Sequence, residues 1–187
     1  MEFKDKRVII TAGAGGIGRE TTRLFVEAGA KVFICDIDET ALGNTLSSFD
    51  NVSGVRVDVS EPDQFKTFFN KADEYLGGLD IMVNNAGTAG PTALIEDISL
   101  EEWSNCININ LTSAFLGTQE SIPRIKDSNN EGGSIINLSS AAGKFGFPLR
   151  SPYSAAKWAI VGLTRTTALE VGKYGIRCNC IQPGPVD

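Results

Sequence analysis

Short apolar runs alternate with longer amphipathic segments along this chain. Apolar runs without an internal polar period are typical of strands buried on both faces of a parallel sheet. The pattern predicts strands at 7–11, 31–35, 54–57, 79–83, 133–138 and 176–181. It predicts helices at 16–28, 38–48, 61–76, 100–126 (broken near its start) and 152–173. Such alternation indicates an α/β fold with a doubly wound parallel sheet.

Composition is typical of a globular protein in an aqueous compartment. The 187 residues suit one domain, 1–187, with 42% hydrophobic and 21% charged residues. The net charge of −6 disfavours nucleic acid or an anionic membrane as a partner. No apolar run approaches the roughly 20 residues that span a bilayer. The first residues, 1–7, contain no apolar signal region, so we expect a cytoplasmic protein.

The chain contains no histidine. Imidazole acid–base chemistry and most transition-metal sites are therefore excluded. The cysteines, Cys35, Cys106, Cys178 and Cys180, form no C-x-x-C pair. We interpret them as buried, reduced thiols and expect no metal site.

A glycine-rich loop, 11–18, joins the first predicted strand to the first predicted helix. Dinucleotide-binding folds place their phosphate loop at this junction, where glycines allow a tight turn and close approach of the pyrophosphate. The free N–H groups of the following helix favour the anion. The alternative is a turn required by sterics alone. The predicted cofactor-binding residues here are Gly13, Gly15, Gly16, Ile17 and Gly18.

Asp36 ends the second predicted strand, eighteen residues after Gly18. A carboxylate there would accept hydrogen bonds from the adenosine ribose hydroxyls and would repel the 2′-phosphate of NADP. Ile37, Asp38 and Glu39 follow, with no adjacent cation. The sequence thus favours NAD, with NADP less favoured. Alternatively Asp36 caps the next helix, a role that Asp38 could equally fill.

Tyr153 and Lys157 lie four residues apart in a predicted helix, so both side chains share one face. A free phenol has a pKa of about 10, and a neighbouring cation lowers the pKa of such a group. The pair could therefore exchange a proton with a substrate oxygen near neutral pH. A tyrosine and a lysine on an exposed helix face are the alternative interpretation.

Several motifs occur in one order along the chain. Thr11, Gly16 and Gly18 match T-G-x-x-x-G-x-G, with Ala12 in place of the first glycine. The others are Asp58-Val59, the segment Asn84 to Gly87 (N-N-A-G), Asn110, Ser140 thirteen residues before Tyr153, and Pro183-Gly184. On these motifs the whole chain resembles the short-chain dehydrogenase/reductase family.

The resemblance implies a Rossmann-type sheet of order 3-2-1-4-5-6 and a set of site residues. Tyr153 would exchange the proton, and Lys157 would favour its phenolate and hold the nicotinamide ribose. Ser140 would hydrogen-bond the substrate oxygen, with Ser139 as the neighbouring candidate, and Asn110 would complete a proton relay through water. Further cofactor contacts are expected from Asp58, Val59, Asn85, Ala86, Gly87, Tyr153, Lys157, Pro183, Gly184 and Val186.

The chain departs from the family pattern at two places. Ala12 replaces a glycine, and Gly13 and Gly15 are expected to preserve the turn. The chain also ends at Asp187, where family members usually continue with a substrate lid, a further helix and a seventh strand. We therefore expect that this C-terminal region is lacking. The sequence does not distinguish a truncated chain from a naturally short one.

The predicted function is hydride transfer between NAD(H) and a secondary alcohol or ketone. The alternatives are a non-catalytic nucleotide-binding sensor or assembly subunit and, less favoured, a sugar-nucleotide epimerase. Phe145, Phe147 and Leu149 could form an apolar substrate wall, and Arg150 could meet a carboxylate or lie in solvent. Helices near 102–126 and 152–173 resemble the family's dimer contact, which implies a homodimer or homotetramer, with simple core packing as the alternative.

Overall fold

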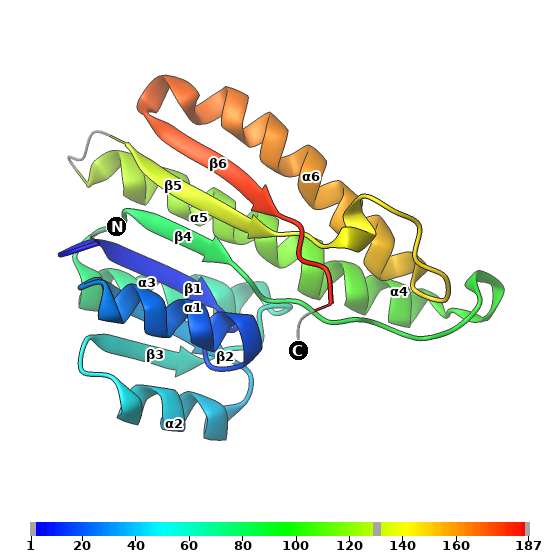
Figure 1. Ribbon diagram of the computed structural model, residues 1–187, viewed down its shortest axis with the longest axis horizontal. Coiled ribbons are helices and arrows are strands. Elements are labelled where there is room, and N and C mark those ends of the chain that lie inside the picture. Colours follow the sequence, from blue (N-terminus) through cyan, green and yellow to red (C-terminus); the bar gives the residue numbers. More distant parts are fainter. Residues whose placement is uncertain (1–2, 129–131, 186–187) are drawn as a thin grey trace.

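The computed structural model describes residues 3–128 and 132–185, which form one six-stranded parallel sheet (Figure 1). The strand order is β3-β2-β1-β4-β5-β6, as predicted. The strands are β1 (Arg7–Thr11), β2 (Lys31–Asp36), β3 (Val52–Arg56), β4 (Ile81–Asn84), β5 (Gly133–Leu138) and β6 (Ile176–Ile181). The helices are α1 (Gly16–Glu27), α2 (Glu39–Ser48), α3 (Pro62–Leu76), α4 (Leu100–Ile107), α5 (Ser113–Asp127) and α6 (Ser151–Val171). The predicted α/β class is confirmed.

Two apolar cores lie on opposite faces of the sheet. Val8 and Ile10 pack in the core beneath α1 and α2, whereas Ile9 between them packs in the core beneath α3, α5 and α6. Three phenylalanines of α3, Phe65, Phe68 and Phe69, are fully buried in the second core. Because successive side chains of a strand point to opposite faces, helices on both sides require apolar residues at every position. This arrangement explains the unbroken apolar runs in the sequence.

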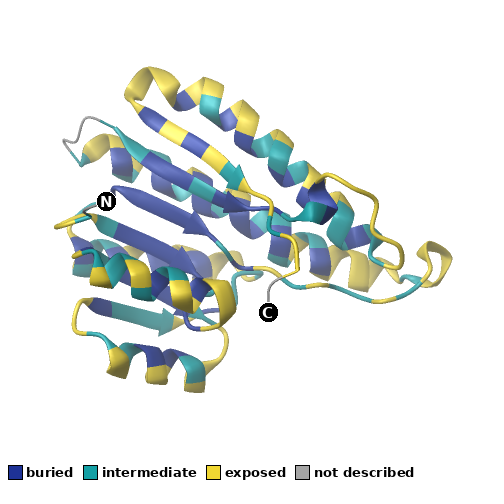
Figure 2. Cartoon of the chain, in the orientation of Figure 1, coloured by how far each residue is buried: buried dark blue, intermediate teal, exposed yellow. Residues whose placement is uncertain are grey.

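Strand β6 departs from that pattern. Ile176 and Cys178 are buried against α6, but Arg177 and Asn179 are exposed on the other face (Figure 2). The prediction that all strands are buried on both faces is therefore wrong for β6 and also for the other edge strand, β3, of which only Val52 is buried. In the described part of the chain, helices cover only one face of β6.

The long helix predicted at 100–126 is not broken near its start; it is divided into α4 and α5 by a change in hydrogen-bond pattern, while the backbone at the junctions stays right-handed helical. Between α4 and α5 lies a π-helical turn, Asn108–Thr112. Such turns insert a residue into the helical hydrogen-bond pattern and are frequent at functional sites. Among the described residues, no helix is long and apolar enough to cross a membrane.

Candidate active site

The carboxyl ends of the parallel strands meet at one edge of the sheet, where open α/β folds bind ligands. Thr11 at the end of β1 ties two of these ends together. Its hydroxyl accepts hydrogen bonds from the backbone N–H groups of Asn85 and Ala86, each at 3.0 Å. The side-chain amide nitrogen of Asn85, Nδ2, in turn donates to the carbonyls of Thr11 and Ala12, each at 3.0 Å. The N-N-A-G segment after β4 is thus fixed against the glycine loop.

The glycines of the loop are required for different physical reasons. A Cβ on Gly13 would lie 2.6 Å from Cγ2 of Ile34, and a Cβ on Gly18 would lie 1.9 Å from the Ala12 carbonyl oxygen. Packing therefore requires glycine at both. A Cβ on Gly15 or Gly16 would meet nothing within 4 Å. This open side leaves the loop backbone accessible to a pyrophosphate.

Ala12 has φ = 49°, in the left-handed region that non-glycine residues rarely adopt. Gly13 and Gly15 do not have positive φ. The left-handed conformation is therefore adopted by Ala12 itself and not by Gly13 or Gly15. A methyl group is tolerated here at a conformational cost that glycine would not carry.

Asp36 lies beside the loop at the end of β2. Its carboxylate accepts hydrogen bonds from the N–H groups of Ala14 and Asp38, each at 3.1 Å. Asp38 is the N-cap of α2 and accepts from the Ala41 N–H at 2.9 Å. The alternative role of Asp36 as that helix cap is thereby excluded.

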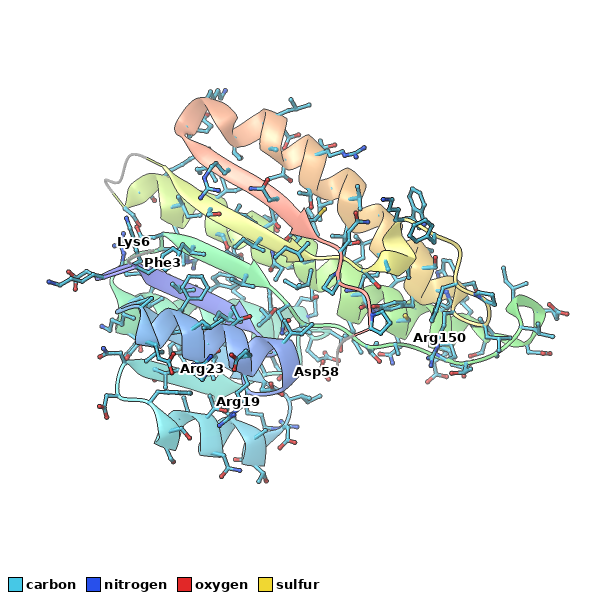
Figure 3. The ribbon with its side chains drawn as sticks, in the orientation of Figure 1. Phe3, Lys6, Arg19, Arg23, Asp58 and Arg150 are labelled. Atoms are coloured by element: carbon cyan, nitrogen blue, oxygen red, sulfur yellow. The ribbon has the colours of Figure 1, made fainter. Side chains whose placement is uncertain are left out.

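A cavity of about 270 Å³ opens next to the Asp36 carboxylate. Asp58 and Val59 line its other side, and Figure 3 shows Asp58 beyond the carboxyl end of β3. The Asp58 carboxylate accepts from the N–H of Ser60 at 2.9 Å, which fixes the turn. The full lining is Ala12, Asp36, Ile37, Val57, Asp58, Val59, Ala86, Gly87, Thr88 and Ile109. Apolar walls with a carboxylate at the rim suit an adenosine.

Asn110 occupies the π-helical turn and is fully buried. Its Nδ2 donates to the carbonyls of Cys106 and Thr88, each at 2.9 Å, and its Oδ1 accepts from the Thr88 N–H at 3.3 Å. A Cβ on Gly87 would lie 2.8 Å from Asn110 Oδ1 and 3.4 Å from Lys157 Nζ. The asparagine and the lysine therefore converge on this glycine.

Lys157 and Tyr153 lie on one face of α6, as their spacing predicts. The lysine is only 4% exposed, and its Nζ donates to the Leu138 carbonyl at 2.8 Å and lies 5.5 Å from the centroid of the Tyr153 ring. Burial lowers the pKa of Lys157 from 10.5 to about 8. The ammonium thus carries its charge near neutral pH in a site that desolvates it.

The two neighbouring serines have separate environments. The Ser139 hydroxyl is buried and donates to the Lys157 carbonyl at 2.7 Å, so it fixes α6 against the end of β5. The Ser140 hydroxyl accepts from the Ala142 N–H at 3.1 Å and lines the cavities described below. This difference favours Ser140 over Ser139 as the substrate contact.

Two adjoining cavities meet at Ser140 and Tyr153. One, of about 240 Å³, is lined by Ile17, Asn85, Gly87, Thr88, Ala89, Asn110, Leu138, Ser139, Ser140, Tyr153, Lys157, Pro183 and Gly184. The other, of about 430 Å³, is lined by Ala89, Ser140, Ala141, Ala142, Phe145, Gly146, Phe147, Arg150, Tyr153, Pro183, Gly184 and Pro185. We name them, after the roles proposed below, the cofactor cavity and the substrate cavity. Of the expected site residues, Val186 lies outside the described residues.

Several lining residues have no signal in the sequence. Thr88, Ala89 and Pro185 line these cavities, yet they lie in segments with no helical or strand periodicity. Leu149, expected in the apolar wall, does not line the substrate cavity, although Phe145 and Phe147 do. Arg150 lies at the substrate cavity with its Nη1 hydrogen-bonded to backbone carbonyls, so it is not simply solvated.

Known proteins share this architecture. Residues 6–187 match the profile of the family described as short chain dehydrogenase. The chain is 40% identical to a 3-alpha-(or 20-beta)-hydroxysteroid dehydrogenase of Mycobacterium tuberculosis, over 97% of this chain and 69% of that protein. It is 38% identical to trans-4-hydroxycyclohexanecarboxylate dehydrogenase of Sinomonas cyclohexanicum, over 97% of this chain and 73% of that protein. A solved short chain dehydrogenase from Mycobacterium smegmatis superposes with a TM-score of 0.91 at 34% identity, covering 99% of this chain and 79% of that one.

The chain therefore belongs to the short-chain dehydrogenase/reductase family. It is an oxidoreductase that acts on alcohols or ketones, and its family uses NAD(P). The residues present fit such a dinucleotide, because one glycine-rich loop contributes Ala12 to the cavity at Asp36 and Ile17 to the cofactor cavity at Lys157. Between these two residues, Gly15 and Gly16 leave the loop backbone open.

Proposed function

We propose that this chain interconverts a secondary alcohol and a ketone with NAD(H), using Tyr153, Lys157, Ser140 and Asn110. The observation that carries the proposal is that Ser140 and Tyr153 line both adjoining cavities. A substrate oxygen held at that junction would meet both hydroxyls, while its carbon would face the cofactor cavity. The bound nicotinamide supplies a hydride acceptor or donor.

Each side chain has a distinct proposed role. Tyr153 takes the hydroxyl proton during oxidation and returns it during reduction. Ser140 donates a hydrogen bond to the substrate oxygen as negative charge develops on it. The Lys157 ammonium stabilises the phenolate by its charge and, in family fashion, holds the nicotinamide ribose. Asn110 supports this lysine from the π-helical turn and completes the proton relay.

We further propose that NAD is preferred over NADP. The Asp36 carboxylate is held at the rim of the adenosine-sized cavity by two backbone N–H groups. Its negative charge would oppose a 2′-phosphate and accept hydrogen bonds from ribose hydroxyls. Ile37 is the next residue and offers no compensating cation.

A homo-oligomer is proposed from the surface of α4, α5 and α6. The exposed large apolar side chains there are Leu100, Trp103, Phe115, Trp158 and Leu169. In the helix near 152–173, which resembles part of the family's dimer contact, Ile160 is only 1% exposed and packs in the subunit's own interior, whereas Trp158 is exposed and could meet a second copy. A two-fold contact would cover such a patch with its own copy. Light scattering at micromolar concentration tests this, and a monomer mass would refute it.

The central test is NADH formation with a panel of secondary alcohols. Turnover by the unmodified protein and its loss in Tyr153→Phe would support the enzyme. The alternative is a nucleotide-binding sensor or assembly subunit. It would be supported if NADH bound tightly while no alcohol or ketone was converted above the Tyr153→Phe background. An intact Tyr153–Lys157 pair argues against that alternative, because binding alone does not require both.

A further inference from the structure

The segment at 88–93, which follows the N-N-A-G motif, is a wall of both cavities although it has no regular structure. Thr88 lines the cofactor cavity, and Ala89 lines both cavities. No helix or strand hydrogen bonds hold residues 88–93. The position of this wall must therefore come from other parts of the chain.

Arg150, which also lines the substrate cavity, contacts this segment directly. Its Nη1 donates to the Gly90 carbonyl at 2.7 Å and to the Ala89 carbonyl at 3.1 Å, and it lies 3.4 Å from the Pro91 carbonyl oxygen. Figure 3 shows Arg150 beside the segment that leads away from β4. Hydrogen bonds from a charged donor are among the stronger ones in proteins.

Arg150 also begins the helix that carries the tyrosine. It is the N-cap residue of α6, and its carbonyl accepts from the Ser154 N–H at 2.9 Å. A second link joins the same two regions, because the Ala93 N–H donates to the Leu149 carbonyl at 3.2 Å. The hydrogen bonds at Arg150 and Leu149 thus determine the distance between the 88–93 wall and Tyr153.

The other side of the segment is held by α4 and the π-helical turn. Asn110 hydrogen-bonds both backbone groups of Thr88. Gly90 has φ = 66°, and a Cβ there would lie 2.7 Å from Sγ of Cys106. The segment therefore lies between two supports, of which Arg150 is the one that faces the substrate cavity.

Arg150 is the single charged residue among the described residues that line the substrate cavity. We propose that Arg150 is a positioning residue: it locks segment 88–93 against the start of α6 and is not a receptor for a substrate carboxylate. The cavity then selects an uncharged, apolar secondary alcohol. The substrate part of this inference rests on the function proposed above.

The contact of Arg150 with segment 88–93, which we call the lock, is tested by hydrogen exchange, a measurement that needs no turnover. Arg150→Met removes the donors and keeps the length of the side chain, Arg150→Lys keeps one cation, and Arg165→Met is a control at an exposed arginine of the same helix. We expect the amides of Thr88 and Ala93 to exchange about tenfold faster or more in Arg150→Met, less so in Arg150→Lys, and unchanged in the control. Unchanged exchange in both Arg150 variants would overturn the lock.

The substrate inference is tested with cyclohexanol and 4-hydroxycyclohexanecarboxylate. We expect the unmodified protein to favour cyclohexanol in kcat/KM, and Arg150→Met to raise KM for both alcohols by a similar factor and to raise the Kd of NADH. A rise in KM for the carboxylate alone would identify Arg150 as an anion receptor and overturn the inference. If the unmodified protein converted no alcohol, the proposed function would fail, while the exchange measurement would still decide the lock.

Discussion

The two halves of the site are built in different ways. Around the proposed cofactor site, the glycine loop and Asp36 lie directly at the ends of β1 and β2, so the pairing of these two strands places them. Around the proposed substrate cavity, the wall at 88–93 is contacted by Arg150, about sixty residues away along the chain. One short stretch, 11–36, contains the residues named for the first half, because β1 and β2 are consecutive strands that pair directly. The second half depends on contacts that form only when distant elements have packed.

The largest expected effect separates chemistry from cofactor binding. Replacing Tyr153 by phenylalanine should lower kcat by about 10²- to 10⁴-fold, because acid–base catalysis is typically worth this much. The Kd of NADH should change little, since other groups hold the cofactor. Tyr174→Phe, at an exposed tyrosine outside both cavities, is the control. Near-full activity of Tyr153→Phe would show that the tyrosine hydroxyl takes no part in proton transfer.

The second prediction concerns the pH dependence of stability. In the folded protein the pKa of Lys157 is about 8, below the 10.5 of an exposed lysine. The folded state therefore binds this proton less tightly than the unfolded state does, and deprotonation between these two pH values favours folding. The free energy of unfolding, taken relative to Lys157→Met, should rise by about 3 kcal/mol from pH 8 to pH 10.5.

Denaturant unfolding at pH 7.5, 9 and 10.5 measures that difference. Groups elsewhere cancel, because both proteins carry them. A difference that stayed flat or fell with rising pH would show that Lys157 is not held in a desolvating site.

The third prediction tests whether the charges at positions 36 and 37 decide between NAD and NADP. Asp36→Ala with Ile37→Arg should shift the NAD-to-NADP preference towards NADP by about tenfold or more, since a repulsive charge is replaced by a phosphate partner. Asp38→Asn is the control, because it removes a charge nearby yet retains a capping side chain. Tighter binding of NADPH than NADH by the unmodified protein would contradict the role of Asp36.

The smallest expected effect is at the strained turn. Ala12→Gly should raise the free energy of unfolding by about 0.5–1 kcal/mol, because relief of the left-handed strain exceeds the added flexibility of the unfolded chain. Ala14, buried at 3% exposure without a positive φ, is the matched site. Ala14→Gly should be destabilising, so opposite signs at two nearby alanines are expected in denaturant melts. Equal signs would show that φ at Ala12 is not the controlling factor.

The element order and most strand positions follow from the sequence. The predicted strands at 7–11, 133–138 and 176–181 agree with the structure, while β3 begins at Val52 and β4 at Ile81, each two residues from the predicted start. Strand ends shift because pairing with a neighbour, and not the apolar pattern, decides where a ladder stops. The change to a π-helical hydrogen-bond pattern within 100–126 was not predictable from the apolar pattern.

The sequence by itself determined the fold class, the family and the residue types at the junction of the cavities. These are carried by local periodicity and short motifs, which act through neighbours in the chain. Only the tertiary structure decided that Ser139 fixes α6, that Ala12 adopts a positive φ, and that Arg150 contacts the 88–93 wall. Each of these depends on which groups distant elements bring within hydrogen-bonding or contact distance, and that is fixed only when the sheet and its helices have packed.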